Sequence, residues 1–501
     1  MNRQTAEKPN ILLIMTDTQR CDTLGCMGSP YAVSPHLDRL AQEGVLFEEA
    51  YTASPVCSPA RSSLITGLHT PVHGCIENGI KRRETFQTLP DALKQEGYTN
   101  LMIGKTHFGT LPSSFDIVHT VEGEKNSGSG SDSYARFLEP HGIPRKSDGP
   151  QSRPEELHME AFLVDRTIEE LEKVRQEGGG PFFAFCSLLS PHSPLDPPGA
   201  WAHLYRDKPL PPIDYRPGDI EALPAQTKRL LGFLGREREM EAALQSPETQ
   251  KHIDEERRLY YGLAAYTDAQ IGRLLDYLDA SGLRRSTLII FTSDHGEQLY
   301  DHGFSDKHNY YDASWRVPFI MSMPGTLPTG ETRDFAVWTD ITATVLGAAG
   351  ASSRYVQGHD LFRPLSDGKP SPRRCGVGTL YRSAAISTKY WKLEYYFDER
   401  EGRLYDRLND PSERSDLFGH PAYREIKDEL LEALLAWRSN LSDLQYLTES
   451  TGGGGPVARR IAPHTLQLSG EDNERRLSEA AELIDNKYKE AHKTFISKGE
   501  S

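Results

Sequence analysis

The sequence predicts an α/β protein with a mostly parallel sheet covered by helices on both faces, followed by a smaller C-terminal α+β part on an antiparallel sheet. Before about residue 376, short apolar runs alternate with stretches of helical pattern, as is typical of parallel strands joined by helical crossovers. After that point, alternating and aromatic runs are separated by turn residues, which favours antiparallel hairpins.

Four strands and four helices are predicted in the first part. The last helix has the clearest spacing, with Ile271, Leu274 and Leu278 on one face before a Gly stop. The strands are expected at 10–17, 99–107, 181–192 and 286–296, and the helices at 36–44, 88–97, 161–178 and 264–282.

Polar residues stand at the carboxyl end of each predicted strand, namely Asp17, Lys105, His192 and the pair Asp294 and His295. Ligands of open α/β sheets bind at these ends. A single polar residue at a strand end is more often simply solvated. Four strands that end in charged or metal-binding residues favour one shared site.

The remaining segments are less regular. Residues 110–158 are rich in Gly, Ser and Pro and are expected to be loop, and residues 205–256 are expected to be a partly helical insertion. The Gly run at 451–457 indicates a linker. The predicted parts are therefore an α/β domain at 1–375, a C-terminal subdomain at 376–450, and a linker with a helical tail at 451–501.

The tail is charged and helix-prone. Its only apolar face is narrow and is formed by Leu477, Ala480, Ala481 and Ile484. Such a face should dock on the same chain or on a neighbouring subunit. The Gly run favours a neighbour, and therefore a homo-oligomer, because it gives the tail the reach to cross an interface.

Composition excludes several classes of partner. Hydrophobic residues make up 37% and charged residues 26%, which is a globular balance. The formal net charge of −15 disfavours nucleic acid and anionic membranes. The apolar run at 11–15 is too short for a signal sequence, so a cytoplasmic location is expected. The six cysteines are scattered and suggest neither a disulfide framework nor a usual zinc pattern.

One short stretch carries distinctive chemistry. In PVCSPARSSLITG, residues 55–67, Cys57 lies between two prolines at the start of a predicted helix, with Arg61 one turn later. Cys57 could be a small core residue, or a thiolate nucleophile whose pKa is lowered by the helix N-terminus and by Arg61. The Cys-x-Pro-x-Arg pattern also matches the motif for conversion of Cys to formylglycine, an aldehyde.

The rest of the chain adds weight to this last alternative, because it resembles the formylglycine-dependent sulfatases of the alkaline-phosphatase-like superfamily. The resemblance covers most of residues 9–420, and the two family signatures fall at 55–67 and 97–107, the second departing from the pattern at Asn100. The matching segments are PNILLIMTDTQR, SPHLDRLAQEGVLFEEAYTASPVCSPARSSLITG, EGYTNLMIGKTHFG, PHSPLDPP, TSDHGEQLYDHGFSDKHNYYDASWRVPFI and EGRLYDRLNDPSERSDL.

The resemblance implies a metal site. Its ligands would be Asp17, Asp294, His295 and the modified residue 57, the formylglycine made from Cys57. Hard oxygen ligands suit Ca²⁺, with Mg²⁺ or Mn²⁺ as alternatives. Thr18 stands where many relatives have a second acid, which leaves the identity of the metal open. This pattern is similar to the branch that includes choline sulfatases and phosphonate monoester hydrolases.

The resemblance also assigns the cations and histidines of the site. Arg61 would fix the hydrated aldehyde, and Lys105 and Lys307 would bind the sulfate oxygens. His107 would take the proton from the second hydroxyl, and His192 would protonate or orient the leaving oxygen. A formylglycine-generating enzyme is the implied maturation partner.

The chemistry of sulfate esters fits this set of residues. A hydrated aldehyde offers two geminal hydroxyls: one attacks sulfur to give a covalent sulfate, and loss of the proton from the other re-forms the aldehyde and expels sulfate. The expected function is therefore a sulfuric ester hydrolase. Its expected substrate is a small sulfated sugar or a glycosaminoglycan-derived fragment, which residues 68–83 (His69, His73, Arg82 and Arg83) could help to bind.

Other functions remain open at this stage. The same apparatus could hydrolyse phosphonate monoesters, phosphodiesters or choline sulfate, because tetrahedral phosphoryl and sulfuryl groups differ mainly in charge. A different class is a non-catalytic binding protein, or a hydrolase in which Cys57 stays a thiol.

Overall fold

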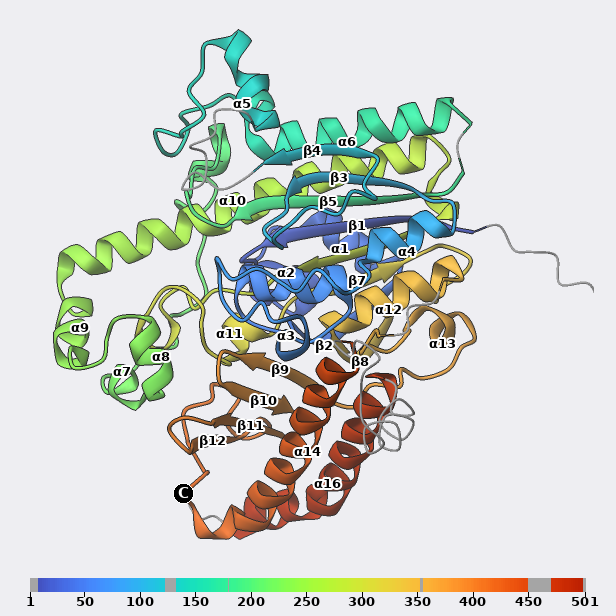
Figure 1. Ribbon diagram of the computed structural model, residues 1–501. Coiled ribbons are helices and arrows are strands. Elements are labelled where there is room, and N and C mark those ends of the chain that lie inside the picture. The colour runs from blue at the N-terminus through green and yellow to red at the C-terminus, as the bar shows by residue number, and fades with distance from the viewer. Residues whose placement is uncertain (1–7, 122–131, 179, 352–354, 449–469, 499–501) are drawn as a thin grey trace, which may run out of the picture.

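The computed structural model describes residues 8–121, 132–178, 180–351, 355–448 and 470–498 (Figure 1). An eight-stranded sheet crosses its centre in the order β4-β3-β5-β1-β6-β7-β2-β8, with only β7 antiparallel to its neighbours. Its strands are β1 (Asn10–Asp17), β2 (Val45–Tyr51), β3 (Thr99–Lys105), β4 (Ile117–Val121), β5 (Phe182–Pro191), β6 (Thr287–Ser293), β7 (Phe319–Ser322) and β8 (Glu331–Val337).

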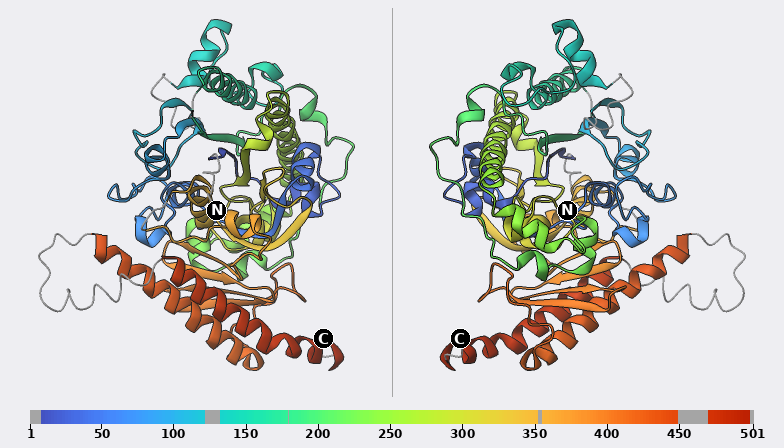
Figure 2. Two further views of the ribbon diagram at one scale, coloured as in Figure 1. Left: turned by 90° about the vertical axis from the view of Figure 1, so that its right-hand side faces the viewer. Right: turned by 90° about the vertical axis from the view of Figure 1, so that its left-hand side faces the viewer.

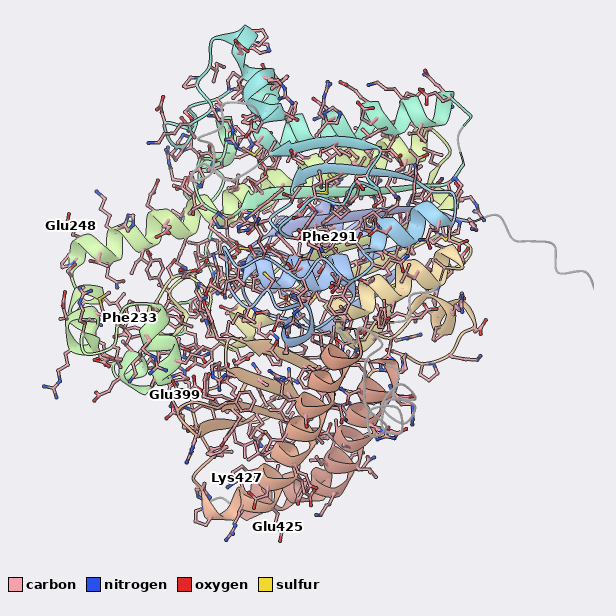
Figure 3. The ribbon with its side chains drawn as sticks, viewed as in Figure 1. Phe233, Glu248, Phe291, Glu399, Glu425 and Lys427 are labelled. Atoms are coloured by element: carbon pink, nitrogen blue, oxygen red, sulfur yellow. The ribbon has the colours of Figure 1, made fainter. Side chains whose placement is uncertain are left out.

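Helices cover both faces of this sheet, as the sequence predicts. Successive residues of a strand point to opposite faces, so Ile11 and Leu13 of β1 pack into one core and Leu12 and Ile14 into the other. The first core includes α2 (Cys57–Thr66), α4 (Leu89–Gln95), α12 (Trp338–Ala349) and α13 (Phe362–Ser366), and the second includes α1 (Pro35–Gln42), α6 (Met159–Gln176) and α10 (Pro247–Ala280). Phe291 of β6, which belongs to the second core, is labelled in Figure 3.

The segment 110–158 is not simply loop, which corrects the expectation from its composition. It contains β4, which pairs in parallel with β3 at the edge of the sheet, and α5 (Ser133–Leu138). Gly, Ser and Pro flank these two short elements, so the average composition of the segment is that of a loop. The five-residue run IVHTV is too short to stand out, but four of its residues are β-branched.

The insertion at 205–256 is partly helical, as expected. It holds α7 (Asp219–Ala222), α8 (Ala225–Leu230), α9 (Glu237–Leu244) and the start of α10. An ion pair between Arg229 and Glu399, the latter labelled in Figure 3, ties α8 to the C-terminal part. None of the helices in the described ranges is long and apolar enough to cross a membrane.

The C-terminal part is a four-stranded antiparallel sheet packed against two long helices, which confirms the predicted antiparallel group (Figures 1 and 2). One core joins this sheet to both helices. The elements are β9 (Gly376–Leu380), β10 (Ser383–Ser387), β11 (Trp391–Tyr396), β12 (Glu401–Asp406), α14 (Arg424–Thr448) and α16 (Gly470–Lys498).

The predicted docking of the tail on a neighbouring subunit is wrong. Leu477, Ala481 and Ile484 of α16 are buried against α14 and the antiparallel sheet of the same chain. The apolar stripe has a partner within the chain because α14 presents its own apolar face alongside. The predicted linker at 451–457 lies outside the described residues, and the boundaries at 375 and 450 stay a prediction.

A buried acid fixes the tail in place. Glu474 accepts hydrogen bonds from Trp437 Nε1 at 2.6 Å and pairs with His69 Nε2 at 2.9 Å, while its other oxygen pairs with Arg373. Arg373 also pairs with Asp340 on α12. One carboxylate therefore connects α16 to α14, to the segment after α2, and to a helix that covers the main sheet.

Glu474→Ala should lower the free energy of unfolding by about 3–5 kcal/mol, because it leaves buried donors and part of a buried positive charge without their partner. Denaturant unfolding monitored by tryptophan fluorescence would measure the loss. Glu479→Ala on the exposed side of the same helix is the control and should cost less than about 0.5 kcal/mol. Equal losses for the two variants would contradict a fastening role for Glu474.

Candidate active site

The four predicted strands with polar ends lie next to one another in the sheet, in the order β3-β5-β1-β6. Lys105 and Asp17 are the last residues of β3 and β1, and His192 and Asp294 directly follow β5 and β6. All four strands run parallel, so these residues meet at one edge. Asp17 and Asp294, which are far apart in the sequence, thus share one site.

Residue 57 enters this site as the first residue of α2. Cys57 Sγ lies 3.0 Å from His295 Nε2. One candidate ligand atom from each of Asp17, Cys57, Asp294 and His295 lies within 4.8 Å of the others, and all four residues are buried. Every residue of α2 is buried, and the helix packs against α12.

Arg61 on α2 lies fully buried between the two carboxylates. Its Nε donates to Asp294 Oδ2 at 2.8 Å, and its Nη2 donates to Asp17 Oδ2 at 2.9 Å. Its Nη1 donates to Ser187 Oγ at 2.8 Å and to the carbonyl oxygen of Lys105 at 3.1 Å. The planar fork of a guanidinium can hold both acids at once, whereas a lysine presents a single point charge.

The cations control the protonation of this cluster. Burial alone would raise the pKa of Asp17, but Lys105 and His192 outweigh it and hold that pKa well below its usual value. Burial and the Asp17 carboxylate also oppose ionisation of the Cys57 thiol, yet its pKa lies well below normal because Lys105 and neighbouring cations favour the thiolate. The site therefore stabilises negative charge at residue 57.

Thr18 occupies a strained position beside the first acid. Its φ of 65° is left-handed, which is costly for a β-branched residue. Three hydrogen bonds hold it there: its backbone N donates to Asp294 Oδ1 at 3.0 Å, its hydroxyl donates to Asp17 Oδ1 at 2.7 Å, and its carbonyl accepts from Tyr260 at 2.6 Å. In place of a second acid, Thr18 thus orients both carboxylates.

Lys307 reaches the same site from the loop that precedes α11 (Asp312–Trp315). Burial would lower the pKa of Lys307, but the Cys57 thiolate and the Asp306 carboxylate raise it, so the side chain stays charged. Glu297 supports this loop by accepting hydrogen bonds from the backbone N of Asp306 and, at 3.3 Å, from that of Leu299.

The two histidines follow strands at the same edge. His107 has a left-handed φ of 51°, and its buried Nδ1 has no hydrogen-bond partner among the described residues. His192 Nδ1 lies 2.7 Å from the carbonyl oxygen of Ser193. In a neutral ring that nitrogen carries the proton, so Nε2 is the acceptor.

The suggestion that residues 68–83 help to bind substrate is wrong for His69 and His73, and for Arg82 and Arg83 it stays a prediction. His69 and His73 are fully buried and form hydrogen bonds within the protein. Arg82 and Arg83 donate to backbone carbonyl oxygens. Within this segment, α3 (Thr70–His73) packs against α2.

Sequence reasoning missed several supporting residues. Ser187 is a small polar residue inside an apolar strand, and only the fold shows that it meets Arg61. Asn78 accepts a hydrogen bond from the backbone N of Ser58 at 3.0 Å and so steadies the first turn of α2. Neither has a signal in the sequence. Glu297 stands three residues after Asp294, where its position beside a matched motif was a usable clue.

Comparisons with known proteins identify the family of the chain. The family model for sulfatases matches residues 9–351, and that for the C-terminal part of N-sulphoglucosamine sulphohydrolase matches residues 300–440. An arylsulfatase of Clostridium perfringens is 30% identical, over 85% of this chain and 94% of its own length. An N-acetylglucosamine-6-O-sulfatase of Bacteroides thetaiotaomicron is 26% identical, over 86% of each chain.

The fold has known counterparts as well. The crystal structure of a phosphonate monoester hydrolase of Agrobacterium radiobacter superimposes with a TM-score of 0.73 at 23% identity, over 86% of this chain and 96% of that one. Such identity supports the fold alone, whereas the family model spans most of the chain. The chain therefore belongs to the sulfatase family and is a sulfuric ester hydrolase of alkaline-phosphatase-like fold.

Proposed function

We propose that this enzyme removes sulfate from a small sulfated sugar, through a formylglycine made from Cys57 and a divalent metal ion. The observation that carries the proposal is the position of residue 57. It lies at the start of a buried helix, 3.0 Å from His295 and among the charged groups that favour an anion at this position.

The residues present fit a divalent cation. Asp17 and Asp294 supply carboxylate oxygens, His295 supplies a nitrogen, and a hydrated aldehyde at position 57 would supply a further oxygen. Mostly oxygen donors suit Ca²⁺, with Mg²⁺ or Mn²⁺ as alternatives. When bound, such an ion polarises a sulfate oxygen and lowers the pKa of a hydroxyl beside it.

Four side chains of the protein have separate roles in the proposed reaction. Lys105 and Lys307 bind the sulfuryl oxygens and balance charge as one hydroxyl of residue 57 attacks sulfur. His192 protonates or orients the leaving oxygen. His107 then takes the proton of the second hydroxyl, so that the carbonyl re-forms and sulfate leaves. The buried Nδ1 of His107, which has no hydrogen-bond partner within the described part of the chain, supports this role.

The substrate class rests on the relatives. One matching family model is named for N-sulphoglucosamine sulphohydrolase, and one relative for N-acetylglucosamine 6-O-sulfate. A glycosaminoglycan-derived mono- or oligosaccharide is therefore the favoured substrate. The second candidate is a phosphonate monoester, which the fold of the Agrobacterium hydrolase favours. Parallel kinetics on aryl sulfate and aryl phosphonate monoesters would separate the two.

We further propose a cytoplasmic location and maturation by a formylglycine-generating enzyme. All six cysteines are free thiols, which is the usual state in a reducing compartment. The motif Cys-x-Pro-x-Arg at 57–61 supports the maturation step.

Conversion of Cys57 should lower the mass of its tryptic peptide by about 18 Da when the protein is isolated from its native host. Cys57→Ser should be nearly inactive and should accumulate covalent sulfate, because a single hydroxyl can attack but cannot expel sulfate by forming an aldehyde. Intact mass spectrometry after incubation with an aryl sulfate would detect the adduct. Cys26→Ser, outside the site, is the matched control and should keep full activity.

Two results would count against this mechanism. If Cys57→Ser turned over as fast as the parent, the second hydroxyl would have no role. If the native protein were fully active with an unmodified thiol, Cys57 would act as a thiolate nucleophile instead.

Asp17→Asn should lose bound metal and reduce activity by more than about 100-fold, because even the outer partners of metal ligands are worth 10–100-fold. Elemental analysis of the purified variant would measure the metal, beside a sulfatase assay. Asp165→Asn, which removes an exposed carboxylate on α6, is the control and should change neither. Full metal content in Asp17→Asn would show that Asp17 is not a ligand.

A further inference from the structure

A cavity adjoins two of the residues proposed to act in the reaction. Lys105 and His192 form part of its wall, and the segment between α5 and α6 supplies Arg145, Arg153 and His158. None of these last three residues has a role in the reaction proposed above. The cavity therefore shares Lys105 and His192 with the candidate active site, and the end of β5 and the loop after it form a further part of its wall.

Arg153 is an uncompensated positive charge in this wall. Only 6% of the residue is exposed. Its Nη1 donates to Tyr134 Oη at 3.1 Å, and its Nη2 donates to the carbonyl oxygens of Pro144 and Arg145 at 2.9 and 2.7 Å. These acceptors are all neutral, and none of the ion pairs among the described residues includes Arg153. A buried cation without an anion is costly, which favours a site that an anion completes.

Arg145 stands beside it. Its Nε pairs with Asp132 at 2.9 Å, and its guanidinium lies 5.1 Å from the centre of the Tyr134 ring, while that of Arg153 lies 5.5 Å from the same centre. One aromatic ring thus contacts both cations. Because Asp132 balances only one of the two arginines, this side of the cavity is positively charged.

The carboxylates in the wall are held by partners of their own. Glu160 Oε2 pairs with His158 Nδ1 at 2.9 Å, and its Oε1 accepts from the backbone N of Ser190 at 2.8 Å. Asp196 lies 3.5 Å from the other nitrogen of His158. His158 thus faces both acids of the wall, Lys105 and Arg145 have acids of their own, and the charge of Arg153 is left over.

We propose that this cavity binds a second anionic group of the substrate, a carboxylate or a second sulfate, through Arg153 with Arg145 beside it. The inference rests on the proposed function and narrows it: the preferred substrate is a sulfate ester that carries a further acid. The acid would lie on the side of the scissile ester that faces Lys105 and His192.

Matched probes test this. The probes are 3- and 4-carboxyphenyl sulfate and their methyl esters, which have nearly the same shape and leaving group but lack the negative charge, together with 1,3-phenylene disulfate. The parent enzyme should prefer the charged probes in kcat/KM. Arg153→Gln should reduce that preference about 10- to 100-fold, as expected for a charged hydrogen bond, and should leave the methyl esters unchanged. Whether the carboxylates or the disulfate show the larger loss identifies the acid.

Three further variants make the test decisive. Arg145→Gln should reduce the same preference, and Arg153→Lys should restore part of it, because charge is kept and the planar fork is lost. Arg136→Gln removes an exposed arginine of α5 in the same segment and should have no effect. Thermal unfolding of each variant separates a local change from general destabilisation.

The outcomes distinguish the two proposals. No turnover of any sulfate probe by the mature parent enzyme would overturn the proposed function itself. Turnover without a preference for the acids, or a preference that survives both Arg153→Gln and Arg145→Gln, would overturn the second anion site and leave the sulfatase mechanism intact.

Discussion

The pairing of two buried carboxylates with one buried arginine is the constraint on which the site depends. Asp17 and Asp294 are fully buried at neighbouring strand ends, where their mutual repulsion and the loss of water would be costly without a cation. Arg61 meets both. To place Arg61 there, α2 must begin at the sheet edge and run into the core, and this same start sets Cys57 beside His295. The positions of the proposed nucleophile and of the proposed metal ligands therefore follow from one electrostatic requirement.

Strain around the site depends on the same pairing. Thr18, His107 and Asp306 have left-handed backbones without being glycine. Such conformations persist only where surrounding contacts hold them. For Thr18 the holding contacts are the two carboxylates that Arg61 fixes. The rigid sheet thus holds loops in backbone conformations that these residues would not adopt on their own.

Much of this could be predicted from the sequence, because strands, helices and strand ends are local patterns. The convergence of Asp17 with Asp294 follows from the rule for parallel sheets, and the Cys57 motif was recognisable in itself. The contacts of Ser187 and Glu474 could not be predicted. Each of these contacts depends on a partner more than a hundred residues away. In addition, a polar residue in a strand, or an acid in a charged helix, gives the same sequence pattern whether its side chain is solvated or buried. The full burial of α2 could not be predicted for the same reason, because its serines and Arg61 are residue types typical of a surface helix.

Because the whole protein is negatively charged, binding of an anionic substrate depends on the cations within the site. With a net charge of −15, the chain repels an anionic substrate at long range. At physiological ionic strength this repulsion fades over about 8 Å, so the groups within the site decide whether the anion binds. There, Arg61 and Lys105 are largely balanced by Asp17 and Asp294. In the mechanism proposed above, the surplus positive charge would come from Lys307 and from a divalent ion, so the proposed metal ligands and the proposed sulfate-binding lysines share one small, buried cluster.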